Sequence, residues 1–361
     1  MPIEPPPSGP HPNGLDPHGP DPHGPQWRIF HGDGSVRTEP VAWPVPPPWR
    51  RFGGGDSGNT SGNTSGNDSG GGGVVGAGAR QSAHYYVEER EADVVNAALH
   101  LHRPLLVTGR PGTGKSTLAV AIAQELGLGA VLRWPVNSRT THVDGLYRYD
   151  AIARLRDSQH SSTPPDIGEY IKLGPLGTAL ADSRPGRPRL LLIDEMDKSD
   201  PDLANDLLVV FEEGGFEIPE LARLRDHETP VDVHLSGTRA TVPVREGQVN
   251  CSQFPVVVIT SNGETDFPPA FLRRCVRLEL NPPDDTRLLR IIEAHLGPEA
   301  VEDAGTHELL AQFLRLRDQE QQELATDQLL SAVHLRLNQV GLEPEVLREA
   351  VLRPLDDTTR P

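Results

Sequence analysis

The chain has 361 residues and a formal net charge of -17, with 51 acidic against 34 basic residues. No part of it offsets this charge with a basic domain, so the composition disfavours nucleic acid as a partner. No stretch approaches the ~18 apolar residues that a membrane helix requires. The two cysteines, Cys251 and Cys275, give no disulfide framework and fit a reducing compartment. We therefore expect a cytoplasmic protein without a membrane partner.

Residues 1–80 are predicted to form a disordered tail. They are dominated by Pro, Gly, Ser and Asn, with a tandem DPHGP at 16–25 and a repeating GNTSGNTSGNDSG at 58–70. The segment VAWPVPPPWRRF (41–52) leaves two alternatives open. It is either an inert linker or a polyproline ligand for an aromatic groove.

A glycine-rich loop stands between a predicted strand (104–108) and a predicted helix (115–126). The pattern G-x-x-x-x-G-K-S turns backbone N–H groups inward around a phosphate, and the helix N-terminus adds positive potential. Lys115 is expected to reach the β- and γ-phosphates, Ser116 to ligate Mg²⁺, and Thr117 to support the neighbouring phosphate. The predicted nucleotide-binding residues are Gly109, Arg110, Pro111, Gly112, Thr113, Gly114, Lys115, Ser116 and Thr117.

The segment LLLIDEMDKSD (190–200) runs four apolar residues into a cluster of acids. An apolar run without alternation fits a strand that is buried on both faces of a parallel sheet. The acids either point into solvent or surround a cation, and the phosphate loop favours a cation. Asp194 is expected to hold Mg²⁺, directly or through water, and Glu195 to polarise a water molecule against the γ-phosphate. For Asp197 and Lys198 we expect structural or interface roles.

A third buried strand, FPVVVITSNGE (254–264), ends in polar residues around Asn262. An Asn-Gly pair alone usually marks a turn. A side-chain amide at a strand tip can instead orient the attacking water or contact the γ-phosphate. Lys115, Asp194, Glu195 and Asn262 converge only if their strands are neighbours in one sheet. The predicted fold is therefore an α/β core of P-loop type with a parallel sheet, over residues 81–280.

Two adjacent arginines, Arg273 and Arg274, precede the next apolar strand in DFPPAFLRRCVRLEL (266–280). With this segment, the order of motifs resembles that of the AAA+ ATPases. The resemblance implies ATP as the nucleotide and a ring of subunits, commonly a hexamer. It also implies an arginine finger that acts on the ATP of the adjacent subunit. Arg274 occupies the place of that finger, and Arg273 is the alternative.

More specifically, the chain resembles the MoxR-type AAA+ ATPases, which carry an insertion in their second helix. The segments RWPVNSRTTHVDGLYRYDAIARL (133–155) and GPLGTAL (174–180), closely followed by IDEMDK (193–198), carry this resemblance. It implies that residues 148–173 form the insertion and contact a substrate or partner. It also makes a protein with a von Willebrand factor A domain a candidate partner. Residues 231–249 alternate apolar and polar side chains and predict a β-hairpin.

From residue 281 onward, helical apolar spacing predicts a small helical lid over 281–361. The expected helices span 284–297, 308–318, 326–341 and 344–354. Many AAA+ lids place a basic sensor near the start of the third helix. Here no Arg or Lys lies between Arg317 and Arg336. The sequence therefore leaves open whether the lid carries a second sensor, and lid closure on ATP can rely on other contacts.

Two functions remain open at this point. The first is an ATP-hydrolysing ring that remodels or activates a partner protein. The second is a slowly hydrolysing switch that binds ATP to order an assembly or to recruit a partner. Glu195 and Asn262 argue against a dead site, whereas the unassigned second sensor leaves slow turnover open. A P-loop kinase ranks third, because nothing in the sequence suggests a pocket for an acceptor substrate.

Overall fold

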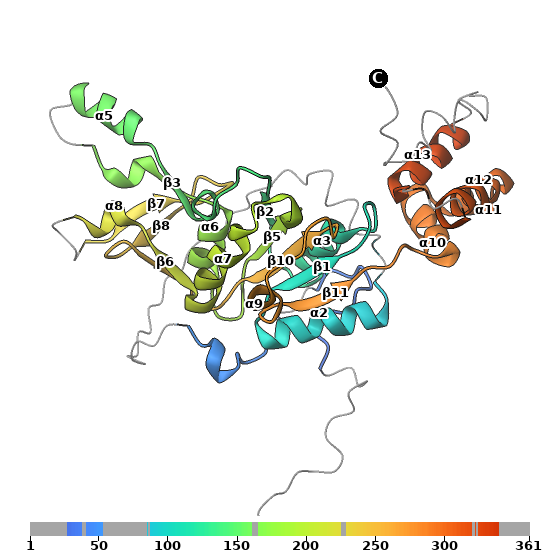
Figure 1. Cartoon of the computed structure of the whole chain (residues 1–361), viewed down its shortest axis with the longest axis horizontal. Coiled ribbons are helices and arrows are strands. Elements are labelled where there is room, and N and C mark those ends of the chain that lie inside the picture. Colours follow the sequence, from blue (N-terminus) through green and yellow to red (C-terminus); the bar gives the residue numbers. More distant parts are fainter. Residues whose placement is uncertain are drawn as a thin grey trace, which may run out of the picture.

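The structure is a computed structural model that describes residues 27–37, 41–52, 85, 87–160, 165–224, 229–319, 322 and 324–338. Its centre is a five-stranded parallel sheet with the strand order β11-β1-β10-β5-β2 (Figure 1). The strands are β1 (Leu105–Thr108), β2 (Leu132–Pro135), β5 (Leu190–Asp194), β10 (Val256–Ser261) and β11 (Val276–Glu279).

Helices cover both faces of this sheet, and the apolar run of β5 shows why. Leu190 and Leu192 pack into a cluster with α2 (Glu89–Leu101) and α3 (Lys115–Glu125). Leu191 and Ile193 pack into a second cluster with α6 (Pro175–Asp182) and α7 (Asp202–Glu213). Successive strand residues point to opposite faces, so a strand between two helical layers needs apolar residues at every position. The predicted αβα core with a parallel sheet is confirmed.

A smaller sheet lies beside the core, with the order β3-β4-β7-β8. The expected insertion pairs β3 and β4 in antiparallel fashion, and the helix α5 projects from their ends at the upper left of Figure 1. The expected hairpin pairs β7 with β8, whereas β9 pairs with β6. The elements of this region are α4 (His142–Leu146), β3 (Tyr147–Tyr149), α5 (Ala151–His160), η2 (Ile167–Tyr170), β4 (Ile171–Leu173), β6 (Gly215–Glu217), α8 (Pro219–Ala222), β7 (Val231–His234), β8 (Thr241–Val244) and β9 (Gln248–Asn250).

The C-terminal part is helical, as predicted, and has its own apolar core with Leu288, Phe313 and Leu329 at its centre. It lies at the opposite end of the molecule from α5 (Figure 1). The fourth expected lid helix lies outside the described residues. In the described part of the chain, no helix is long and apolar enough to cross a bilayer. The lid consists of α10 (Asp285–Leu296), α11 (Pro298–Glu302), α12 (Ala304–Leu314), η4 (Arg315–Gln319) and α13 (Thr326–Leu337).

Two segments of the predicted tail, 27–37 and 41–52, pack against the core, so the structure here differs from the prediction of disorder. In the first segment Phe30 is fully buried. Its N–H and C=O both bond to the side chain of the buried Asn96 on α2, at 3.0 and 2.7 Å. The carboxylate of Glu125, at the end of α3, accepts from two further backbone N–H groups of this segment. Composition predicted disorder because apolar residues are few, but one buried amide and one buried carboxylate satisfy the backbone here.

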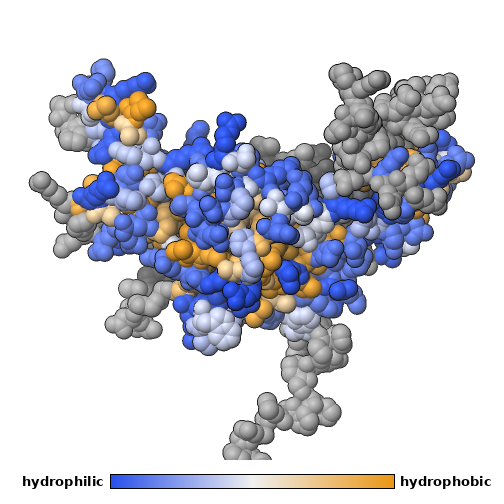
Figure 2. All heavy atoms as spheres, in the orientation of Figure 1, coloured by the Kyte–Doolittle hydropathy of each residue, from blue (hydrophilic) through white to orange (hydrophobic). Residues whose placement is uncertain are grey.

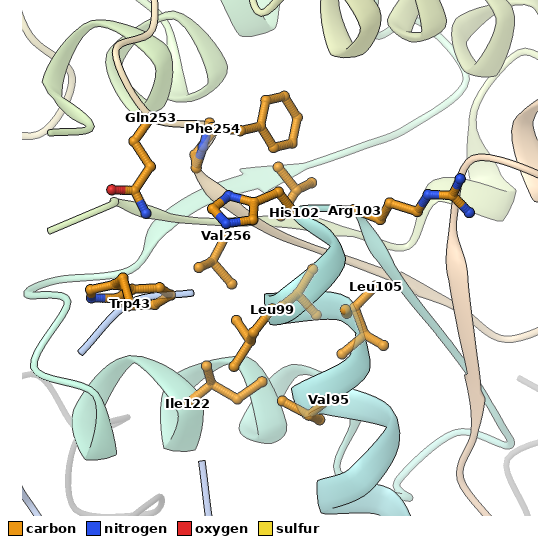
Figure 3. Close-up of a pocket in the computed structure, with 14 residues that line it drawn as sticks. Trp43, Val95, Leu99, His102, Arg103, Leu105, Ile122, Gln253, Phe254 and Val256 are labelled. Carbon is orange, nitrogen blue, oxygen red and sulfur yellow. The ribbon is translucent and has the colours of Figure 1, made fainter. Parts of the chain in front are cut away.

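The second segment docks under the amino-terminal edge of the sheet. Figure 3 shows the Trp43 ring beside apolar side chains of α2, α3 and β10. Arg50 donates to the carbonyl oxygens of His102 and Phe211 and stacks over the ring of Phe254, 4.4 Å from its centroid. Thus residues 41–52 are neither an inert linker nor, in this structure, a ligand for another protein, because the chain's own core holds them. The other residues of the predicted tail lie outside the described ones.

Candidate nucleotide site

The strands that carry the predicted site residues are neighbours in the sheet. β10 lies between β1 and β5, and the phosphate loop, Asp194 and Asn262 all follow the carboxyl ends of these strands. The convergence that the sequence analysis required is therefore met by the fold. In open parallel sheets this edge is where ligands bind.

The phosphate loop curls around its own lysine. Lys115 begins α3, and its ammonium donates to the carbonyl oxygens of Gly109 (2.8 Å) and Arg110 (2.9 Å). Burial lowers the pKa of Lys115, and the carboxylates of Asp197, Asp194 and Glu195 oppose that shift. The two carbonyl oxygens hold the ammonium beside the loop where a phosphate can replace them.

Asp194 is the centre of a hydrogen-bond network that joins β5, β10 and the start of α3. Its Oδ1 accepts from Ser116 Oγ at 2.7 Å and from Thr260 Oγ1 at 2.6 Å. Thr260 Oγ1 in turn accepts from the backbone N–H of Glu195 at 2.9 Å. Sequence analysis singled out Ser116, Asp194 and Glu195 but missed Thr260. A polar residue inside an otherwise apolar buried strand was the available signal, because it must find a partner.

The residues present fit Mg²⁺ bound together with a nucleotide. Ser116 Oγ and Asp194 Oδ1 are adjacent hard oxygen donors. Magnesium takes one or two such protein ligands and completes its shell with phosphates and water. Within the described residues, no cluster of three or more His, Cys, Asp or Glu able to hold a metal occurs.

Glu195 has a left-handed backbone conformation, with φ 61° and ψ 46°. For a residue other than glycine this costs about 1–2 kcal/mol. The strained backbone and the bond to Thr260 turn the Glu195 side chain outward at the strand tip, where it is half exposed. There it forms an ion pair with Lys198 at 3.0 Å, which raises the pKa of Lys198. Lys198 therefore pairs within its own subunit in this structure.

Asp197 holds the loop that carries Asn262. Its side chain is buried, and Oδ2 accepts from the backbone N–H groups of Asn262 (2.9 Å) and Glu264 (3.2 Å). Its other oxygen, Oδ1, is buried and has no hydrogen-bond partner among the described residues. The sequence interpretation gave Asp197 a structural or interface role. The structure specifies that role, since Asp197 fixes the position of Asn262 relative to Asp194 and Glu195.

Two loop glycines bring other parts of the chain against the phosphate loop. A Cβ at Gly112 would lie 2.5 Å from Cβ of Ala325, at the start of α13. A Cβ at Gly114 would lie 2.6 Å from the ring of Tyr85. Both glycines also have positive φ, at 75° and 89°. The lid and the segment before α2 therefore touch the loop because glycine stands at these two positions.

The lid has basic residues outside the start of its third predicted helix, where many AAA+ lids carry a sensor. Arg317 lines a small cavity together with Arg110, Gly112 and Thr326. Its guanidinium is held by the carbonyl of Pro283 and by Asp318. Arg336, in contrast, pairs with Asp303 within the lid. A basic side chain near the phosphate loop thus comes from the segment before α13 rather than from α13 itself.

The two candidate finger arginines lie away from the phosphate loop of their own subunit. They lie between α9 (Pro269–Leu272) and β11, just before the first residue of β11, which pairs with the first residue of β1. The phosphate loop follows the last residue of β1, at the opposite edge of the sheet. Arg274 donates to Glu212 and to the carbonyl of Ala270. Arg273 is exposed, and its side chain has no hydrogen bond or ion pair within the described residues.

One comparison with known proteins matches the core. Residues 104–275 match the family model of the AAA domain, dynein-related subfamily. No curated protein matches the chain. The match begins one residue before β1, ends one residue before β11 and supports an AAA+ ATPase, a class whose members bind nucleotide and typically form rings. It agrees with the sequence resemblance at the level of the superfamily.

Proposed function

From the premise that residues 104–275 form an AAA domain, we propose that the protein is a Mg²⁺-dependent, MoxR-like ATPase that remodels or activates a partner protein in the cytoplasm. The observation that carries this proposal is the network in which Ser116, Asp194 and Thr260 join the phosphate loop to two neighbouring strands. This network supports the proposal because Ser116 and Asp194 offer two adjacent oxygens beside Lys115, and Thr260 also accepts from the backbone of Glu195.

Binding of ATP rests on the phosphate loop. Its backbone N–H groups and the N-terminus of α3 receive the phosphates, and Lys115 exchanges its two carbonyl partners for phosphate oxygens. Ser116 and Asp194 would hold Mg²⁺, which would neutralise charge on the phosphates. Thr117 supports the phosphate next to Ser116.

Hydrolysis requires a water molecule in line with the γ-phosphate. Glu195 accepts a proton from that water after leaving Lys198, and the side-chain amide of Asn262 orients the water. Asp197 keeps Asn262 in place through the backbone. The charge that develops on the phosphoryl group is stabilised by Lys115 and by an arginine from the neighbouring subunit.

We assign that arginine to Arg274, with Arg273 as the alternative. Neither can serve the ATP of its own subunit, because both lie toward the amino-terminal edge of the sheet. Head-to-tail contacts that bring this edge to a neighbour's phosphate loop close into a ring, and six subunits are our expectation. A protein with a von Willebrand factor A domain is the proposed partner on the resemblance alone.

The test is the steady-state ATPase rate against protein concentration, with the mass of the assembly measured alongside. Wild type is expected to gain specific activity as subunits associate. Glu195→Gln should bind ATP without hydrolysing it, and Arg274→Ala should lose turnover while still binding ATP. A rate that is independent of concentration, or unchanged by both Arg274→Ala and Arg273→Ala, contradicts the shared site.

The ion pair between Glu195 and Lys198 favours a second candidate, a slowly hydrolysing assembly switch. In that case the ring forms with ATP, but wild type barely turns over and Glu195→Gln changes little. Lys198→Ala tests whether this ion pair limits the turnover of ATP. It should accelerate hydrolysis several-fold if the ion pair restrains Glu195, and it should leave the rate unchanged if other contacts limit turnover.

A further inference from the structure

A cationic pocket lies between the core and the small sheet, on the side of β2 that faces the insertion. It is open, has a volume of about 610 Å³, and is lined from β2, the loop after it, α4, β3, β4, the start of α6 and the loop after β7. None of its residues belongs to the nucleotide site. This volume lies within the ~300–1,000 Å³ of ligand pockets, and the open side of the pocket leaves room for a segment of chain to enter.

The charges of this pocket are opposite to those of the protein as a whole. Four basic side chains line it against one acid, Asp144, in a chain of net charge -17. The basic residues are Arg133, Arg139, Arg148 and Lys172, and all four are exposed.

These basic groups are poorly neutralised by the protein itself. Asp144 forms an ion pair with Arg148 at 3.5 Å, but Thr141 occupies its other oxygen. Arg133, Arg139 and Lys172 have no ion pair within the described parts of the chain. Three like charges around one pocket repel one another and are therefore relieved by an anionic ligand.

The backbone adds to the same potential. Gly174 and Pro175, at the N-terminus of the eight-residue helix α6, form part of the pocket wall. Gly174 has no side chain to cap this helix, so the positive helix end has no side-chain acceptor at its cap. The helix end and the basic side chains thus both favour an anionic ligand.

Carboxylates fit this pocket better than nucleic acid does. Single-stranded nucleic acid needs aromatic side chains on which bases stack. The one aromatic residue that lines the pocket, Trp134, is only 4% exposed. A longer polyanion would also meet the negative surface of the protein outside the pocket, whereas a short acidic peptide would not. Arginine side chains bind carboxylates in bidentate fashion.

We propose that this pocket binds an acidic peptide segment of a partner protein. Arg133, Arg139 and Lys172 pair with its Glu or Asp side chains, and Arg148 joins them once it exchanges Asp144 for the ligand. An acidic segment gives the client of the proposed function a defined chemistry. The proposal rests on that function only for the fate of the segment after it has bound. Binding itself needs no nucleotide.

The test measures fluorescence anisotropy of a labelled peptide of alternating Glu and Gly, with the full-length protein and no nucleotide. The same peptide with Gln in place of Glu and a labelled single-stranded DNA of equal length serve as comparisons. Arg139→Glu/Lys172→Glu leaves two basic residues against three acids in the pocket. The matched control, Arg51→Glu/Arg187→Glu, makes the same charge change at two exposed arginines outside the pocket.

We expect the Glu peptide to bind and the Gln peptide not to bind. The pocket variant should weaken binding at least ~10-fold and the control less than ~2-fold, and added salt should weaken it as well. Equal loss in the control, equal binding of the Gln peptide, or tighter pocket-dependent binding of DNA would each overturn the proposal. The ATPase rate of the pocket variant should match wild type, so failure here is distinguishable from failure of the proposed function.

Discussion

Replacing Asp197 with Asn tests whether the position of Asn262 depends on a buried carboxylate. In the native chain, Asp197 Oδ2 accepts from two backbone N–H groups, at 2.9 and 3.2 Å. A bond to a charged acceptor contributes about 1.5–3 kcal/mol and a bond to a neutral one about 0.5–1.5 kcal/mol. Two such bonds therefore lose about 2 kcal/mol together. In addition, the new NH₂ group takes the place of Oδ1, which has no hydrogen-bond partner among the described residues.

The expected effect on catalysis is larger than the effect on stability. Once the loop relaxes, Asn262 moves relative to Glu195, and a displacement of about 1 Å costs on the order of 100-fold in rate. Lys115 also loses the carboxylate that most strongly opposes the lowering of its pKa by burial. Its pKa falls further, so the loss of activity at alkaline pH should begin at a lower pH than in wild type.

The assay combines turnover, nucleotide affinity and amide exchange. Asp197→Asn should lower kcat about 100-fold, leave ATP affinity within a few-fold, and remove the exchange protection of the Asn262 and Glu264 amides. Asp266→Asn is the matched control, because this exposed acid lies in the same loop and its side chain forms no hydrogen bond or ion pair with the described residues. Unchanged turnover with unchanged protection in Asp197→Asn refutes the positioning role.

Three further predictions concern the surroundings of the site. Phe30→Ala should lower the free energy of unfolding by about 3–5 kcal/mol, measured by urea denaturation, because the side chain is fully buried; an effect below 1 kcal/mol means that the N-terminal segment does not dock in solution. Burial lowers the pKa of His102, although the hydrogen bond to the carbonyl of Pro44 opposes this shift. The contribution of His102 to stability is therefore present above the unfolded pKa of about 6.5 and is lost as pH falls through the lower folded pKa. Thermal melts should show that loss in wild type and a flatter pH profile in His102→Asn, which tolerates the left-handed backbone; parallel profiles contradict it. Gly112→Ala should displace the lid at Ala325 and weaken ATP binding at least ~10-fold in a titration with labelled nucleotide, whereas Gly129→Ala, also at positive φ but with open space around it, should cost stability without affecting binding.

Much of the core could be predicted because its signals are local. The apolar run of 190–193, the glycine-rich loop and the Asn at a strand tip are each readable within a dozen residues. The sheet order then brings them together, and parallel strands with helical crossovers leave few alternatives. Thr260 was missed because its importance lies in the register that sets it beside Asp194, and no local pattern reports that register.

The packing of residues 27–37 and 41–52 against the core was not predicted, because no local pattern indicates it. Their composition is that of a disordered chain, but folding depends on the free energy of specific contacts rather than on average hydropathy. Asn96 lies 66 residues from Phe30 along the chain and bonds to both polar groups of its backbone. A buried Asn on an apolar helix face is a visible anomaly in the sequence. Its partner, however, cannot be identified without the fold.

These contacts also bear on the nucleotide site, through α3. The first residue of this helix is Lys115, and Glu125, its last, accepts the N–H groups of His31 and Gly32. Burial raises the pKa of Glu125, and the two backbone bonds oppose that shift, so the carboxylate is stabilised mainly by the docked segment. Removing the segment takes both N–H donors away from Glu125, at one end of the helix whose other end follows the phosphate loop. A truncation that deletes residues 27–37 should therefore lower stability and ATP affinity together, whereas Phe30→Ala should lower stability more than affinity, because it leaves the bonds to Glu125 in place.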